Sequence, residues 1–148
     1  MTVSLANPAT VEVGTSLPEL AVRAIRFEHI LMFALVLRDS NPIHFNVDAV
    51  RDAGLGDHVV NQGGASLAYI LNLLCQWAGS RSAVQRIECR FSANVVANDD
   101  VVASGVVTAV RDDERGRVVD CDVWLDVRGG ARAILGTATV LLANDGGV

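Results

Sequence analysis

Four long runs rich in β-branched residues fill the second half of the chain and restrict its fold more than any other feature. They cover residues 84–96, 100–111, 117–127 and 131–143. Short turn sequences rich in Asn, Asp and Gly separate them, and apolar residues alternate with polar ones along the third run. The pattern predicts three successive hairpin connections within one antiparallel sheet.

The first half of the chain supplies one helix that can pack on this sheet. Residues 67–78 are apolar nearly all round, which predicts a helix buried on most of its faces. Gly63-Gly64 precedes this helix and Gly79 closes it. Glycine at the start lets a backbone or a ligand approach closely and leaves the first N–H groups of the helix free.

The remaining predicted elements are short. A helix runs from Arg26 or Phe27 to about Leu37, and a second one covers residues 48–53. Residues 11–18 and 20–25 are interpreted as two short strands. The ends, about 1–10 and 144–148, are expected to be frayed.

Length and composition describe one domain, residues 1–148, with a substantial core. No apolar run approaches the ~18 residues that span a bilayer, and no secretory signal is apparent, so we expect a cytoplasmic protein. The formal charge of −5 argues against nucleic-acid binding. Cys75, Cys89 and Cys121 lack a C-x-x-C pairing and are interpreted as buried thiols, with no zinc site.

The segment from Arg38 to His44 carries the most chemistry. Asp39 and His44 lie five positions apart, and Pro42 between them prevents a helix from continuing. A bend of this kind can turn a carboxylate and an imidazole toward one point, where they can move protons to and from water. A purely structural role is the alternative, because Asp39 can cap a helix and Asn-Pro commonly starts a turn.

The string D-S-N-P-I-H, residues 39–44, resembles the D-x-N-P-[ILV]-H signature of MaoC-like (R)-specific enoyl-CoA hydratases, also called hydratase 2. Arg90-Phe91 followed by residues 98–101 is similar to a strand-turn-strand of the same family. The resemblance implies an α+β hot-dog fold, in which a curved antiparallel sheet wraps around one long central helix. The predicted strands and the single apolar helix agree with that architecture.

The resemblance also implies a reaction. Water would add to a trans-2-enoyl thioester of coenzyme A or of an acyl carrier protein, or would leave the (R)-3-hydroxyacyl form. Asp39 and His44 would hold the water and divide the proton transfers, with Asn41 either orienting them or only forming the turn. The backbone N–H of Gly63 would stabilise the enolate oxygen. No metal or redox cofactor is needed, since coenzyme A is part of the substrate.

Two departures from the family keep other functions open. The family stretch A-H-G-M reads Asn61-Gln62-Gly63-Gly64 here, and Arg38 stands where the family has Gly. The chain could therefore be a non-catalytic or partly catalytic subunit of a heteromeric hydratase for steroid or long acyl chains. A hot-dog acyl-CoA thioesterase is a further alternative.

Other residues near the motif have weaker roles. Gln62, Gly64 and His58 are possible cleft residues, although Gly63-Gly64 could instead serve close helix–sheet packing. His29 is interpreted as a surface histidine, and Ser66 lacks the G-x-S-x-G context of a nucleophile. We expect a homodimer, with a heteromer as the alternative.

Overall fold

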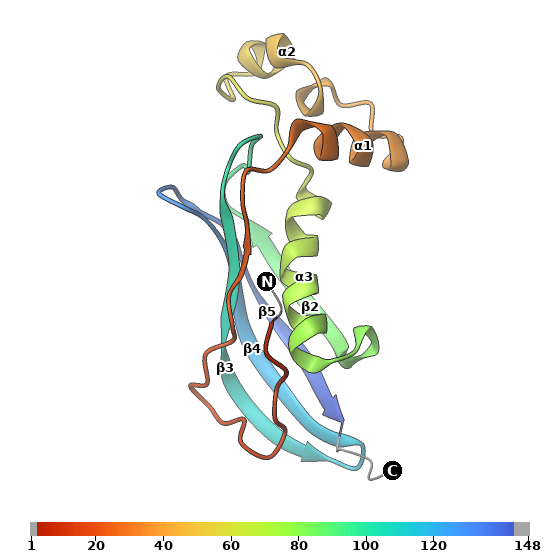
Figure 1. Cartoon of the computed structure of the whole chain (residues 1–148), viewed down its shortest axis with the longest axis vertical. Helices are drawn as coiled ribbons and strands as arrows, with labels where there is room; N and C mark the ends of the chain where they lie inside the picture. The colour runs from red at the N-terminus through yellow and green to blue at the C-terminus, as the bar shows by residue number, and fades with distance from the viewer. Residues whose placement is uncertain (1–2, 144–148) are drawn as a thin grey trace.

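A five-stranded antiparallel sheet curves along one side of the long helix α3 (Gly63–Ala78), as Figure 1 shows. The computed structural model describes residues 3–143. The strands are β1 (Leu20–Val22), β2 (Val84–Phe91), β3 (Val101–Asp113), β4 (Gly116–Val127) and β5 (Arg132–Ala143). The hot-dog fold expected from the sequence is confirmed.

The core lies between α3 and the inner face of the sheet. Alternate residues of β4, from Val119 to Leu125, are fully buried, whereas Asp120 and Asp122 between them point away from the core. Ile70, Leu73 and Leu74 of α3 are fully buried against this face. Burial of these apolar side chains is what holds the helix on the sheet.

The strand order β1-β3-β4-β5-β2 differs from the predicted succession of hairpins. The β3–β4 and β4–β5 hairpins are confirmed, but β2 pairs with β5 and does not form a hairpin with β3. The edge of β3 that faces away from β4 is occupied by β1, whereas the corresponding edge of β5 is the one that β2 occupies. Gly136 of β5 lets β2 approach closely, because an added Cβ would lie 2.2 Å from the carbonyl oxygen of Glu88.

The predicted strand at 20–25 is confirmed only over Leu20–Val22, and the one predicted at 11–18 is wrong. Residues 11–18 follow the edge of β3 irregularly, with a single bridge between Ser16 and Val106. β1 covers only three residues, and Ala24 beyond it has a left-handed backbone with a φ of 47° that interrupts extended pairing. The sequence pattern was too short to distinguish a regular strand from an irregular segment that runs along the edge of the sheet.

Residues 3–10, the described part of the N-terminal segment, contact the rest of the chain. Val3 is buried in the core, and the backbone N–H of Ala6 donates to the carbonyl oxygen of Trp77 at 2.7 Å. Residues 1–2 and 144–148 lie outside the described residues.

Two short helices and a loop lie at the N-terminal end of α3 (Figure 1). The helices are α1 (Phe27–Leu37) and α2 (Val47–Asp52), joined through the 3-10 turn η1 (Pro42–His44). A second 3-10 turn, η2 (Arg81–Ala83), links α3 to β2. Among the described residues, no helix has both the length and the apolar character needed to cross a membrane.

Candidate active site

The loop between α1 and η1 is bent by its own hydrogen bonds. Arg38 ends α1 in the left-handed conformation, and the N–H of Asp39 donates to the carbonyl oxygen of Ala34 at 2.8 Å. Asp39 Oδ1 accepts from the N–H of Asn41 at 3.1 Å, and Asn41 Oδ1 accepts from the N–H of Ile43 at 3.4 Å. The Asn41 side chain therefore forms the turn.

Asp39 and His44 come together at the end of this bend. Asp39 Oδ2 lies 3.3 Å from His44 Nε2, and His44 is 8% exposed. His44 Nδ1 lies 2.7 Å from the carbonyl oxygen of Val60, which can only accept a hydrogen bond. Nδ1 therefore carries a proton, and Nε2 is the ring nitrogen that faces Asp39.

Gly63 lies beside this pair, at the start of α3. Gly63 and His44 both line a cavity of about 310 Å³. As the first residue of α3, Gly63 has a backbone N–H without an acceptor inside the helix, at the positive end of the helix dipole. The cavity thus combines an imidazole with an N–H donor suited to an anionic oxygen.

Gly63 also contacts β2 closely, as the packing alternative requires. An added Cβ would lie 3.2 Å from the ring of Phe91, whereas an added Cβ on Gly64 would meet no atom within 4 Å. Of the two glycines, only Gly63 packs closely against β2, and this packing is compatible with a free backbone N–H on Gly63.

The three residues considered as possible cleft residues do not line this cavity. The Gln62 amide donates through Nε2 to the carbonyl oxygen of Ile30 in α1 at 3.1 Å, and Gln62 Oε1 has no partner among the described residues. Gly64 is exposed, and His58 is exposed in the loop after α2. The sequence predicted these residues near the site, but none of them lines the cavity that His44 and Gly63 share.

The cavity includes residues that the sequence did not single out for this role. Val60 orients His44 through its carbonyl oxygen, and Asn61, Ser66 and Phe91 line the cavity wall. A backbone carbonyl leaves no signal in a sequence, and Phe91 reaches the site only because β2 runs beside α3. A polar Asn61 between Val60 and the start of an apolar helix was the one available signal.

A second hollow, of about 450 Å³, adjoins the same pair from the side of α1. Its walls include Leu31, Ala34, Leu35 and Phe45, and Asp39 lies at its edge. Within residues 3–143, no three His, Cys, Asp or Glu side chains are grouped so that they could hold a metal ion.

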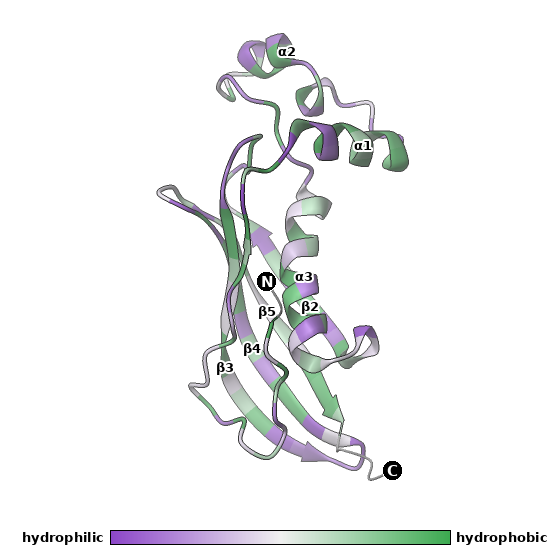
Figure 2. Cartoon of the chain, in the orientation of Figure 1, coloured by the Kyte–Doolittle hydropathy of each residue, from purple (hydrophilic) through white to green (hydrophobic). Residues whose placement is uncertain are grey.

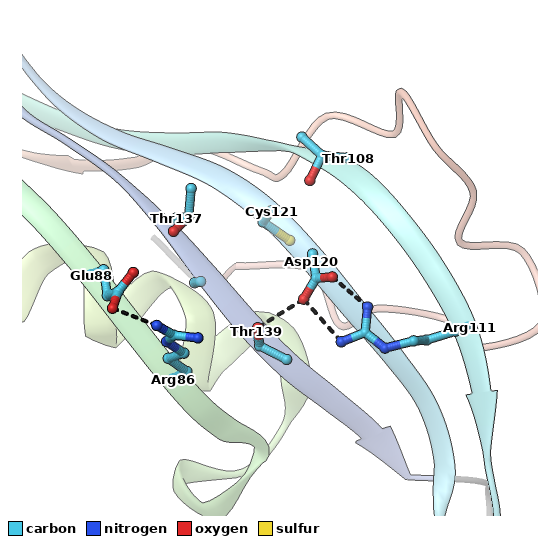
Figure 3. A pocket seen from close by; sticks show the side chains of 9 residues that line it. Arg86, Glu88, Thr108, Arg111, Asp120, Cys121, Thr137 and Thr139 are labelled. Carbon is cyan, nitrogen blue, oxygen red and sulfur yellow. Dashed lines mark hydrogen bonds and ion pairs between the residues drawn. The ribbon is translucent and has the colours of Figure 1, made fainter.

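A polar hollow on the opposite face of the sheet is occupied by charge pairs, which Figure 3 shows. Asp120 accepts hydrogen bonds from Arg111 and from Thr139, and Arg86 pairs with Glu88. The Arg111 guanidinium, followed by the Thr139 hydroxyl, lowers the pKa of Asp120. Burial, with Asp120 and Asp122 nearby, raises the pKa of Cys121 to about 12, so this thiol is not a nucleophile at neutral pH.

The chain thus has a hot-dog sheet with a carboxylate–imidazole pair at the N-terminal end of its central helix. Such a pair can transfer protons, and a helix N-terminus can stabilise an anion. The family model of the MaoC like domain matches residues 8–127. The chain belongs to this MaoC-like family, as its D-S-N-P-I-H string predicted.

Solved structures agree with the family. The (R)-hydratase from A. caviae involved in PHA biosynthesis is 25% identical, with 90% of this chain and 98% of that chain covered and a TM-score of 0.78. The ChsH1-ChsH2 complex from Mycobacterium tuberculosis is also 25% identical, with the same coverage and a TM-score of 0.75. The C-terminally truncated HadBC (3R-hydroxyacyl-ACP dehydratase) complex from Mycobacterium tuberculosis is 20% identical, covers 89% of this chain and 98% of that chain, and shares the fold with a TM-score of 0.66. No curated protein matches the chain in sequence.

Proposed function

We propose that the chain is an (R)-specific hydratase of trans-2-enoyl thioesters, which also catalyses the reverse dehydration of (R)-3-hydroxyacyl thioesters. The observation that carries the proposal is the contact of 3.3 Å between Asp39 Oδ2 and His44 Nε2, next to the cavity that His44 shares with Gly63. The (R)-hydratase from A. caviae, which has the same fold, supports the stereochemistry.

Each step of this reaction has a candidate group in the chain. The water oxygen bonds to Cβ as the Asp39–His44 pair takes one of its protons. The π electrons between Cα and Cβ then form a double bond from Cα to the carbonyl carbon, and the carbonyl π electrons move onto the thioester oxygen. The N–H of Gly63 stabilises that negative oxygen. When the enolate collapses, the pair delivers a proton to Cα, so one water is added in total.

Protein groups supply all of these functions, and we therefore propose a reaction without a metal or redox cofactor. The proton on His44 Nδ1 is held by Val60, which leaves Nε2 and Asp39 Oδ2 to share the transferred proton. A backbone carbonyl is a fixed orienting group, because it cannot rotate away as a side chain can. The two proton transfers belong to the pair as a unit.

The first test measures the reaction directly. Purified protein is incubated with crotonyl-CoA or with trans-2-octenoyl-CoA, and the loss of the conjugated enoyl absorbance and the release of free thiol are followed. Hydration lowers the absorbance without thiol, and an (R)-specific 3-hydroxyacyl dehydrogenase identifies the product's configuration. Thiol release would establish a thioesterase instead, and no reaction would favour a subunit that needs a catalytic partner.

The second test assigns the residues. Asp39→Asn and His44→Ala should each lower kcat by about 10²-fold or more, as loss of a general acid or base does. His29→Ala and His58→Ala are matched controls, because both histidines are exposed and outside the cavity, and they should keep the wild-type rate. Near-full activity of both site variants would refute the assignment.

We also propose that the chain pairs with a second copy of itself. Large apolar side chains on α1 are exposed, from 41% for Phe27 to 77% for Val36, and Figure 2 colours much of this helix as hydrophobic. The outer edge of β2 is the end of the described sheet and has no neighbouring strand. An apolar helix and an unpaired strand edge are surfaces that a partner usually covers. The ChsH1-ChsH2 and HadBC neighbours are complexes, which makes a related chain the alternative partner.

A further inference from the structure

Two buried polar side chains share the cavity with His44 and Gly63. Ser66 is 4% exposed and Asn61 is 6% exposed, and both line the cavity wall. A buried amide or hydroxyl is costly unless it is hydrogen-bonded. Within residues 3–143, the buried polar side chains are His44, Asn61, Gln62 and Ser66, and all four lie around the start of α3.

The direction of the hydrogen bond between Asn61 and Ser66 determines whether the Ser66 hydroxyl can donate to another molecule. Asn61 Nδ2 donates to Ser66 Oγ at 3.0 Å. An amide nitrogen cannot accept, so Ser66 Oγ serves as the acceptor and its own proton must be donated to another atom. Among residues 3–143, the only side-chain hydrogen bond of Ser66 is the one that it accepts from Asn61. The hydroxyl of Ser66 is thus a donor without an acceptor on the wall of the cavity.

Ser66 is also correctly placed relative to Gly63. The two residues are three positions apart in α3, and residues with this spacing share one face of a helix. The N–H of Ser66 itself donates to the carbonyl oxygen of Gln62 at 3.0 Å, which fixes Ser66 in the first turn. The free N–H of Gly63 and the free O–H of Ser66 therefore belong to the same helix end and the same cavity.

We propose that the Ser66 hydroxyl is a second hydrogen-bond donor to the thioester oxygen, beside the N–H of Gly63, and that Asn61 is a positioning residue that directs the Ser66 proton into the cavity. This inference rests on the proposed function, because it names a second group that binds the same oxygen. Ser66 is not a nucleophile here: it forms no covalent bond and keeps its proton. The hydrogen bond shortens while the enolate carries its charge and relaxes when Cα is protonated.

Three variants test the roles of the two residues. Ser66→Ala removes the donor and should lower kcat by about 10²-fold, the usual cost of losing one oxyanion donor. Asn61→Asp keeps the shape, but a carboxylate can only accept, so the Ser66 hydroxyl should donate its hydrogen bond to Asp and no longer to the thioester oxygen, which should lower kcat by a similar factor. Ser66→Thr retains the hydroxyl and should recover most of the activity.

The matched control is Ser92→Ala, because Ser92 is exposed after β2 and does not line the cavity. It should keep the wild-type kcat. Thermal unfolding of each variant separates a loss of folding from the loss of the hydrogen-bond donor. Loss of the donor alone should lower kcat and leave the unfolding temperature at the wild-type value. Wild-type kcat in folded Ser66→Ala would overturn the inference.

A spectroscopic readout separates this inference from the proposed function. Butanoyl-CoA with a ¹³C-labelled thioester carbonyl cannot be hydrated, and its C=O stretching frequency falls as hydrogen bonds to the oxygen strengthen. The bound frequency should be lower for the wild type than for Ser66→Ala or Asn61→Asp. If this difference appears in a protein that does not hydrate crotonyl-CoA, the proposed function fails and the donor role stands. Equal frequencies, or no binding of butanoyl-CoA, would overturn the donor role.

Discussion

The backbone of Arg38 has the conformation that favours glycine, the residue usual at this position in the family. Arg38 has a φ of 54° and a ψ of 38°, which is the left-handed conformation that glycine adopts most readily. This conformation ends α1 and turns the chain so that Asp39 can reach His44. The family's usual Gly at this position therefore has a conformational reason, and Arg38 retains the turn at a cost in strain.

Replacing Arg38 by glycine should release that strain. The αL conformation costs a non-glycine residue roughly 1–3 kcal/mol, and part of the gain is lost to the larger unfolded-state entropy of glycine. We expect Arg38→Gly to raise the free energy of unfolding by about 1 kcal/mol in urea denaturation. Asn98→Gly is the matched control with a smaller change, because Asn98 has a φ of 73° and Asn tolerates it. A lower stability of Arg38→Gly would mean that the arginine side chain contributes to folding.

At the same scale, the sequence predicted the Asp39–His44 pair but not how it is held. The Pro42 bend and the carboxylate–imidazole spacing were sufficient to bring the two residues together in the prediction. Gln62 was interpreted as a cleft residue, yet its amide bonds to Ile30 and links α1 to the start of α3. That contact joins residues 32 positions apart, and no local pattern contains it.

The pairing of β2 with β5 depends on one close approach between the strands. An added Cβ on Gly136 would lie 2.2 Å from the carbonyl oxygen of Glu88 and 2.9 Å from Cys89 Cα. Backbone atoms cannot move aside without breaking the β2–β5 hydrogen bonds. The strand β2 carries Phe91 to the cavity, so this pairing also shapes the site.

Gly136→Ala and Gly64→Ala form a matched pair at the scale of elements. Gly136→Ala should lower the free energy of unfolding by about 2–3 kcal/mol, because overpacking forces the backbone apart. Gly64→Ala fills open space in α3 and should raise it by about 0.5–1 kcal/mol, the usual helical preference for Ala over Gly. Both values come from denaturant unfolding followed by circular dichroism. Equal effects of the two variants would contradict the close contact at Gly136.

The sequence predicted helices and strands correctly where a regular residue pattern extended over a long continuous segment. The helix at 67–78, the helix from about residue 26 to 37 and the four β-rich runs correspond to α3, α1 and β2 to β5. The strand predicted to pair with β2 was wrong. Turn residues such as Asn98 indicate that the chain bends, but they do not indicate which strand pairs with β2. Pairing depends on which sheet edge is free, and only the assembled sheet determines that.

The whole molecule has an exposed apolar helix, and its pairing with a second copy can be tested. Val36→Glu places a charge on α1 at a position that is exposed in the single chain, so it should leave folding intact and shift the protein from dimer to monomer in sedimentation equilibrium. Val13→Glu is the matched control, since Val13 is also exposed but lies in the N-terminal segment beside β3.

Two results would contradict the homodimer. A wild type that is monomeric at micromolar concentration would indicate that a different chain covers α1. A Val36→Glu variant that remains dimeric would place the contact elsewhere on the surface.

The sequence alone determined the hot-dog class, the central apolar helix and the residues of the Asp39–His44 pair, because these depend on periodicity, turn chemistry and a short contiguous motif. The tertiary structure alone decided which groups surround the pair. Val60 holds the His44 proton, Phe91 packs on Gly63, and the Asn61 amide donates a hydrogen bond to Ser66 Oγ. Such contacts depend on which strand edge is free and on how far one helix lies from another, and a sequence does not record these distances.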